Sequence, residues 1–331
     1  MKDLKFKILS VCLSVVSVFV FTEILLRING LGYDNAGFEN SSVFHHEHKK
    51  DYVFVNDNPA SSLPLFEIYY DDDGCVSSSD YEEKDLPLIV LMGDSYLEGA
   101  QVSFDSSLTH GLQKEFQSTY RIKNYAVGSY SPIIHNLLWK NKIKYLKPEK
   151  VILQLYVNDV AEDSLYLTKA KYNSSGELIA IDGGEQSFIR SIARSFYVFR
   201  WLRKYYMQWR FNLIEDKSKF KIGDRFAEAD SYFKNTETEI QLRQLSESII
   251  QEGVELILVV IPSRYRHMTD DSYKPKFYKE IKDWSYERCR FLDLQIRFDQ
   301  EKPRSLFFED DIHFNSKGHK VVLEEFINAI R

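Results

Sequence analysis

The chain has 331 residues, of which 44% are hydrophobic and 28% are charged, and its formal net charge is -6. This is ordinary globular composition, with room for one large domain or two small ones. The negative balance gives no support for a nucleic-acid partner.

A long apolar segment opens the chain. The run Ile8–Leu26 has about the 20 residues that a helix needs to cross the hydrocarbon core of a membrane, and Glu23 is its only charged residue. Three lysines precede it, at positions 2, 5 and 7, which favours a cytoplasmic N-terminus. The residues that follow directly, Arg27-Ile28-Asn29-Gly30, do not form a small-x-small cleavage site, so we expect residues 1–28 to be an uncleaved single-pass anchor. The alternative is a cleaved signal peptide.

Residues 29–85 are polar and irregular, and we interpret them as a spacer and lead-in to the main domain. Tyr52–Val55 and Phe66–Tyr70 are candidate short strands. His45, His46 and His48 suggest a metal site, but no second cluster of ligands accompanies them, so we expect no metal.

From Leu86 to the C-terminus the pattern alternates between apolar strands and amphipathic helices. We expect strands at Leu86–Met92, Arg121–Val127, Val151–Val157, Val254–Ile261 and Phe291–Gln295. We expect helices at Ser106–Ser118, Ile133–Leu146, Glu237–Glu252 and Ser316–Ile330. This alternation predicts an α/β domain over 86–331, with a parallel sheet between two helical layers and ligands at the carboxyl ends of the strands.

An insertion at about 163–233 interrupts this alternation. Within it, Ser187–Phe211 holds six basic residues and nine aromatic residues but no acidic residue. One interpretation is a helix that lies on a membrane surface or lines a polysaccharide groove. The other is a helix whose aromatic side chains pack on the domain while its arginines face water.

Two short motifs, one near each end of the domain, carry the chemistry. Ser95 follows the first strand in Gly93-Asp94-Ser95, which puts a hydroxyl at the carboxyl edge of the sheet. A serine hydroxyl is a weak nucleophile until a base takes its proton, and His313 is the candidate base. Asp310, three residues before His313, is the candidate that orients the imidazole, and Asp311 is the alternative.

Each of these residues also has a purely structural interpretation. Ser95 is a suitable cap for the helix after the first strand. Asn158-Asp159 is typical of a turn after a strand, and His313 has the alternative of an ordinary surface histidine.

Four blocks in this order resemble the SGNH (GDSL-type) hydrolase family, in particular its membrane-anchored bacterial branch. They are Gly93–Gly99, Asn124–Pro132, Tyr156–Asp159 and Asp310–His313. The resemblance implies an SGNH/flavodoxin-like fold, a Ser95-His313-Asp310 triad and an oxyanion hole. The donors of that hole would be the Ser95 N–H, a backbone N–H of Gly128 or Ser129, and the Asn158 side chain.

Two positions depart from the family pattern. The glycine of the second block falls, by its spacing from Asn124, on Ser129 rather than on Gly128, which leaves open which N–H is the donor. The glycine of the third block is replaced by Tyr156, and this larger side chain predicts a reshaped substrate pocket.

The sequence therefore predicts a membrane-anchored serine esterase that forms an acyl-enzyme and needs no metal or cofactor. Its extracytoplasmic placement (periplasmic in a Gram-negative cell) suggests acyl esters of an envelope glycan or lipid. One alternative is an O-acyltransferase of a surface polysaccharide, and another is a catalytically silent glycan-binding module. Cys75 and Cys289 either pair in that oxidising compartment or remain two independent thiols.

Overall fold

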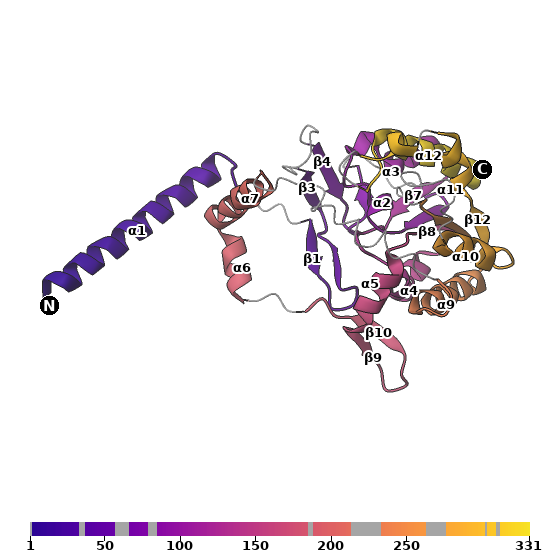
Figure 1. Ribbon diagram of the computed structural model, residues 1–331, viewed down its shortest axis with the longest axis horizontal. Coiled ribbons are helices and arrows are strands. Elements are labelled where there is room, and N and C mark those ends of the chain that lie inside the picture. The colour runs from indigo at the N-terminus through magenta and orange to yellow at the C-terminus, as the bar shows by residue number, and fades with distance from the viewer. Residues whose placement is uncertain are drawn as a thin grey trace. The chain divides into compact units, whose positions relative to one another are not determined.

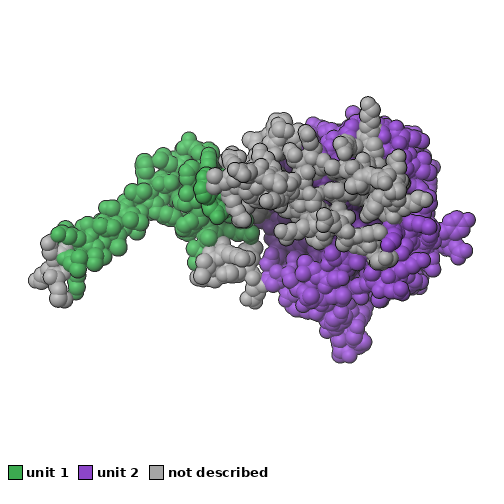
Figure 2. Space-filling model, viewed as in Figure 1, with its two compact units in different colours: residues 1–36, 58–63, 185–217 green, residues 37–57, 64–184, 218–331 purple. Residues whose placement is uncertain are grey.

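The computed structural model describes residues 2–32, 37–56, 66–78, 85–184, 188–212, 233–262, 276–301, 303–308 and 312–331. The chain divides into two compact units (Figure 2). One comprises residues 1–36, 58–63 and 185–217, and the other comprises residues 37–57, 64–184 and 218–331.

An eight-stranded sheet forms the centre of the larger unit (Figure 1), in the order β12-β11-β8-β6-β7-β5-β4-β3. Five of its strands are parallel: β6 (Leu88–Met92), β7 (Arg121–Asn124), β8 (Lys150–Leu155), β11 (Glu255–Val260) and β12 (Arg290–Leu292). The order β7-β6-β8-β11-β12 is the 2-1-3-4-5 order of flavodoxin-like sheets. Such sheets bind ligands at the carboxyl ends of their first and third strands, here β6 and β8.

Helices cover both faces of this sheet. Side chains alternate along each strand, so Ile89 and Leu91 of β6 lie in one apolar core while Val90 and Met92 lie in the other. The first core includes α3 (Leu108–Phe116), α11 (Leu294–Gln300) and α12 (Ser316–Ile330). The second includes α4 (Pro132–Asn141), α9 (Glu237–Gln251) and α10 (Lys276–Ser285). The predicted three-layer α/β/α fold is confirmed.

The segment expected as a spacer adds three antiparallel strands to the same sheet. They are β3 (Tyr52–Asn56), β4 (Phe66–Tyr70) and β5 (Val76–Ser77). Val76 of β5 pairs with Asn124 of β7, so the chain before Leu86 continues the sheet of the domain. β3 and β4 occupy the two stretches with strand-like sequence, whereas β5 has only two residues and leaves no periodic pattern.

Two small hairpins lie outside the main sheet. Strands β1 (Phe38–Asn40) and β2 (His46–His48) pair in the lead-in. Strands β9 (Ala170–Tyr172) and β10 (Leu178–Ile181) form a hairpin at the start of the predicted insertion, after α5 (Asp159–Leu167). The backbone N–H of Ile181 donates to the Val43 carbonyl, and that of His45 to the Ile181 carbonyl, which ties the two regions together.

Several element boundaries differ from those expected. The strand expected to reach Val127 ends at Asn124, because the Asn124 side chain accepts from the Ala126 N–H and turns the chain. The helix expected over Ile133–Leu146 ends at Asn141, and a 3₁₀ turn follows at Ile143–Leu146. The last strand ends at Leu292 because Asp293 caps α11 through the Gln295 N–H. Two further 3₁₀ turns are Phe104–Ser106 and Pro303–Leu306.

The smaller unit is helical and contains α1 (Lys2–Ile28), α6 (Phe188–Ser195) and α7 (Tyr197–Asn212). Within α1, Leu4–Ile28 has a mean hydropathy of 2.4 and is long and apolar enough to cross a membrane. A signal sequence would pass the same test of length and composition.

Candidate active site

Ser95 stands at the carboxyl end of β6, where the chain enters the short helix α2 (Ser95–Glu98). Gly93 is required there because a Cβ would lie 2.5 Å from the side-chain oxygen of Gln154. The Asp94 carboxylate accepts from the Tyr96 N–H at 2.8 Å and caps α2. Asp94, rather than Ser95, is therefore the capping residue, and the Ser95 hydroxyl is left for another partner.

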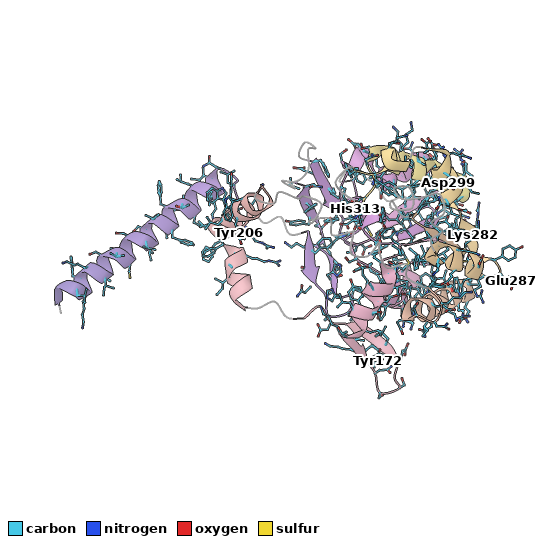
Figure 3. All side chains as sticks on the ribbon, in the orientation of Figure 1. Tyr172, Tyr206, Lys282, Glu287, Asp299 and His313 are labelled. Atoms are coloured by element: carbon cyan, nitrogen blue, oxygen red, sulfur yellow. The ribbon has the colours of Figure 1, made fainter. Side chains whose placement is uncertain are left out.

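That partner is His313. Its Nε2 lies 2.7 Å from Ser95 Oγ, although the two residues are 218 positions apart in the chain. His313 precedes α12, whose start is capped by Asn315 through the N–H groups of Lys317 and Gly318. Figure 3 labels His313 in the larger unit. Asp310 and Asp311, the two candidates that would orient the imidazole, lie outside the described residues.

Tyr96 and Tyr156 support the histidine loop. The Tyr96 hydroxyl donates to the Ile312 carbonyl at 2.8 Å, and its ring centre lies 5.2 Å from that of His313. Tyr156 is buried, with its ring centre 4.7 Å from that of Tyr96. Tyr156 thus lies beneath a side chain that positions His313.

The Gly128-Ser129 turn approaches Ser95 from β7. A Cβ on Gly128 would lie 3.8 Å from the Cβ of Ser95. The Gly128 N–H already donates to the Glu98 carboxylate at 2.8 Å, so it is not available to a second acceptor. Ser129 adopts a left-handed conformation with φ of 65°, and no acceptor for its N–H is recorded among the described residues. Of the two candidate donors, Ser129 is the one whose N–H is open.

Asn158 follows β8 and immediately precedes α5. Burial raises the pKa of Glu162, one turn into α5, and the nearby side chains of Ser129 and Asn158 oppose that rise. The side chains of Asn158 and Ser129, expected from separate blocks, therefore both lie near one carboxyl group. Glu162 was not among the expected site residues, because nothing in its spacing distinguishes it from an ordinary helix-surface glutamate.

Several buried carboxyl groups surround the site. Burial raises the pKa of Asp94 to about 6, opposed by its hydrogen bond from Tyr96 and by the nearby His313. Burial, with the negative charge of Asp94 beside them, also raises the pKa values of Asp159 and Glu162. The region around Ser95 is thus poorly solvated, which strengthens its electrostatic interactions.

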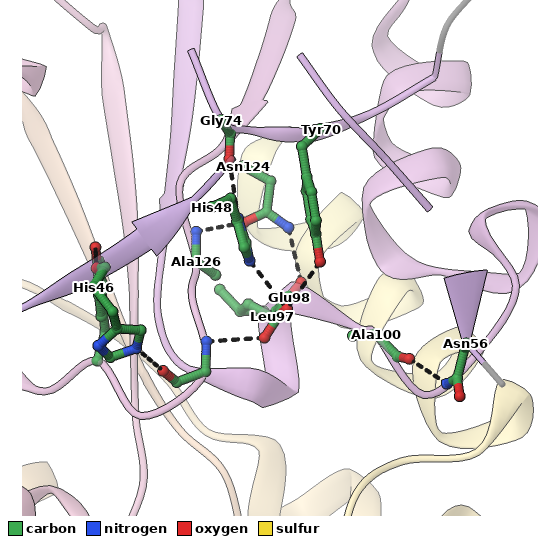
Figure 4. Close-up of polar contacts among 12 residues, drawn as sticks. His46, His48, Asn56, Tyr70, Gly74, Leu97, Glu98, Ala100, Asn124 and Ala126 are labelled. Carbon is green, nitrogen blue, oxygen red and sulfur yellow. Dashed lines mark hydrogen bonds and ion pairs between the residues drawn. The ribbon is translucent and has the colours of Figure 1, made fainter. Parts of the chain in front are cut away.

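A second polar cluster, centred on Glu98, is joined to Gly128 by the hydrogen bond from the Gly128 N–H (Figure 4). Glu98 is 3% exposed, and its carboxylate contacts His48 Nε2 at 3.0 Å and accepts from the Tyr70 hydroxyl at 3.3 Å. His48 is stacked on Tyr70, and its Nδ1 lies 3.0 Å from the Gly74 carbonyl oxygen.

The neighbouring His46 Nε2 lies 2.8 Å from the Gly128 carbonyl oxygen. Of the histidines considered as metal ligands, His46 and His48 thus contact backbone carbonyls and Glu98, while His45 contacts His46 and Lys169. No group of three or more potential metal ligands occurs within the part of the chain that the structure describes.

Cys75 is buried and Cys289 partly buried, and both are free thiols.

No protein-family model matches the chain, and no curated protein matches it at a significant level. Similar solved structures include TesA, with 11% identity and a TM-score of 0.43, covering 74% of this chain and 98% of that one. A mutant of Axe2, an acetyl-xylooligosaccharide esterase from Geobacillus Stearmophilus, has 16% identity and a TM-score of 0.45, covering 74% and 94%. The lipase/acylhydrolase from Enterococcus faecalis has 10% identity and a TM-score of 0.41, covering 74% and 95%.

Proposed function

We propose that the protein is a serine esterase that cleaves acyl esters through an acyl-enzyme. The observation that supports this most directly is the 2.7 Å hydrogen bond between Ser95 Oγ and His313 Nε2. A nucleophile and base within this distance can transfer a proton as the new bond forms. In this proposal the third member of the triad is Asp310, which accepts from His313 Nδ1.

The reaction has two halves. Ser95 Oγ attacks the ester carbonyl while its proton passes to His313 Nε2, and the tetrahedral intermediate collapses when His313 returns that proton to the leaving alcohol. Water then loses a proton to His313 as it attacks the acyl-enzyme. His313 returns that proton to Ser95 Oγ as the second tetrahedral intermediate collapses and the carboxylic acid is released. The proposed oxyanion donors are the N–H groups of Ser95 and Ser129 and the Asn158 amide, which would together stabilise the developing negative charge.

We further propose that α1 is a retained anchor and that the catalytic unit acts outside the cytoplasm. The lysines before the apolar segment support this orientation. The contacts of Glu23 in α1 with the N–H groups of Tyr197 and Val198 in α7 support retention. The proposed substrates are acyl esters of an envelope glycan or lipid, because these are the esters that an enzyme held at that surface would meet.

The test is p-nitrophenyl acetate hydrolysis by Ser95→Ala and by Ser118→Ala, a matched control at an exposed serine. We expect Ser95→Ala to lose measurable turnover and labelling by a fluorophosphonate probe, and Ser118→Ala to keep both. Hydrolysis that survives in Ser95→Ala would refute the assignment. Product analysis with and without a glycan acceptor separates hydrolysis from acyl transfer.

A further inference from the structure

Helix α7 is attached to the end of the apolar helix by specific polar contacts. The Glu23 carboxylate accepts from the N–H groups of Tyr197 and Val198, both at 3.0 Å, and from Arg27 Nε at 2.8 Å. Glu23 is only 8% exposed, although most of α1 is exposed. The acid that interrupts the apolar segment thus occupies the first turn of α7, where unpaired N–H groups attract negative charge.

Aromatic packing extends this contact. Phe19 has its ring centre 5.3 Å from that of Phe196 and 5.7 Å from that of Phe199. Arg200 Nε donates to the Gly32 carbonyl at 2.7 Å, just beyond α1. These contacts attach α1 to α7 within the smaller unit.

The remainder of α7 presents an exposed apolar face. Its members are 44–59% exposed: Phe199, Leu202, Tyr205, Tyr206 and Trp209. At 3.6 residues per turn these five positions fall within an arc of about 120°, and the cations Arg200, Arg203 and Lys204 follow on the adjoining arc. Residues 188–212 include no acidic residue. We call the five residues the α7 apolar face; Tyr206 is labelled in Figure 3.

We propose that the α7 apolar face lies in the headgroup region of the bilayer that α1 crosses, with Arg203 and Lys204 on anionic lipid phosphates. The length of α1 indicates the depth in the bilayer at which α7 begins. From Leu4 to Glu23 the helix rises about 30 Å, which equals the thickness of the hydrocarbon core. Glu23 and the start of α7 therefore lie where α1 leaves the hydrocarbon. Tyr and Trp favour this interface, and basic residues beside it attract anionic lipid.

This proposal rests on the proposed retention of α1, and the experiment separates the two. The full-length protein is reconstituted into liposomes containing a brominated phospholipid, with and without anionic lipid. Flotation reports the anchor, and quenching of tryptophan fluorescence reports depth. The variants are Trp209→Phe and, as a control in the core of the larger unit, Trp284→Phe.

We expect the protein to float with the liposomes and its fluorescence to be quenched. Trp209→Phe should lose most of the quenching, while Trp284→Phe should retain it. Arg203→Gln with Lys204→Gln should abolish the added quenching that anionic lipid produces. Floating protein with unchanged quenching in Trp209→Phe would overturn the proposal and leave the anchor intact. Failure to float would overturn the anchor itself. Protection of Trp209 by an oligosaccharide instead of lipid would identify a glycan groove and also overturn the proposal.

A second inference comes from the lead-in histidines. Lys169 Nζ lies 2.7 Å from His45 Nε2, His45 Nδ1 lies 2.9 Å from His46 Nδ1, and His46 Nε2 lies 2.8 Å from the Gly128 oxygen. Since an ammonium only donates and a carbonyl only accepts, one set of neutral tautomers satisfies all three bonds. In these tautomers Lys169 donates to His45, His45 donates to His46, and His46 donates to the Gly128 carbonyl oxygen. Burial lowers the pKa values of both histidines, that of His45 to about 4, which favours these neutral forms.

The last bond acts on the peptide that joins Gly128 to Ser129. In a trans peptide the N–H points opposite to the carbonyl, so the bond from His46 sets the direction of the Ser129 N–H. A hydrogen bond to the carbonyl also polarises the peptide and makes its N–H a stronger donor. We propose that His46 is a positioning residue that orients the Ser129 N–H as an oxyanion donor, with His45 and Lys169 supporting it. This extends the proposed esterase function.

The test compares two substitutions at one position. His46→Phe keeps a ring against Phe38 and Tyr130 but removes the hydrogen bond, whereas His46→Gln keeps a donor. We expect His46→Phe to lower kcat for p-nitrophenyl acetate about 10-fold with little change in KM, and His46→Gln to recover most of that loss. Fluorophosphonate labelling of both variants monitors the Ser95-His313 pair independently. Equal kcat values in His46→Phe and His46→Gln, or a change confined to KM, would overturn the proposal for His46. Loss of fluorophosphonate labelling in Ser118→Ala would instead count against the assignment of the protein as an esterase that uses Ser95.

Discussion

The buried Glu98–His48 contact offers a quantitative test of how the site is held together. We predict that Glu98→Gln lowers the free energy of unfolding by about 3 kcal/mol. The carboxylate lies against three polar groups, on Gly128, His48 and Tyr70, and it is nearly inaccessible to water. An amide offers one acceptor oxygen and one NH₂ group, so if its oxygen stays on His48 and Tyr70 the Gly128 N–H faces a second donor. An unsatisfied buried polar group costs about 1–3 kcal/mol.

The assay is urea unfolding of the detergent-solubilised full-length protein at neutral pH, followed by tryptophan fluorescence. The control is Glu247→Gln, which removes an exposed carboxylate from α9 and should leave the midpoint unchanged. A second variant, His48→Phe, retains the stacking on Tyr70 but removes the ring nitrogens. Because the two residues contact each other, the double variant should cost less than the sum of the single changes. Additive losses, or a loss below about 0.5 kcal/mol for Glu98→Gln, would refute this reasoning.

Three further predictions follow from buried groups. Asp94 and Asp163 each have a pKa raised to about 6 by burial, so the folded state binds more protons than the unfolded state between about pH 4 and pH 6. The free energy of unfolding should therefore fall as pH rises through that window. Asp94→Asn keeps the acceptor that caps α2 and should remove up to about 3 kcal/mol of this fall, measured by unfolding at a series of pH values. An unchanged dependence of the free energy of unfolding on pH in Asp94→Asn would contradict this prediction. Tyr156→Ala should lower the free energy of unfolding by about 3–5 kcal/mol, because it leaves a cavity beneath Tyr96. It should also lower kcat, with a smaller effect on KM. Unchanged kcat at reduced stability would show that Tyr156 does not help to position His313. Cys75 and Cys289 are free, so the denatured, unreduced protein should take up three iodoacetamide groups, whereas a mass showing only one would indicate a disulfide.

The sequence was sufficient to predict the parts of the fold that depend on local pattern. The apolar run before Gly93 predicted a strand buried on both faces, and α12 begins and ends at the expected residues Ser316 and Ile330. Ser95 and His313 could be proposed as partners because each stands in a short motif, one after a strand and one before a helix. The hydrogen bond between Ser95 and His313 joins the two motifs that contain the candidate nucleophile and base.

The parts that the sequence did not predict depend on contacts between distant residues. Nothing in the sequence around Glu98 indicates a special role. Only the fold shows that its carboxylate accepts from the Gly128 N–H and contacts His48. The size of Tyr156 is visible in the sequence, but only the fold shows that its ring lies against that of Tyr96. The irregular composition of the lead-in hid its role for the same reason, since β2 and β5 are too short to show a period.

The strands of the lead-in carry a practical consequence for anyone who shortens this protein. A recombinant chain that begins at Leu86, where the motif-bearing alternation begins, would expose the β7 edge that β5 covers. It would also delete the histidines that contact Gly128 and Glu98. Such a fragment could keep the Ser95-His313 pair and still be a poor, aggregation-prone esterase, because exposed strand edges promote association. Cutting just before Gly37 instead would retain every strand of the sheet while removing the apolar helix.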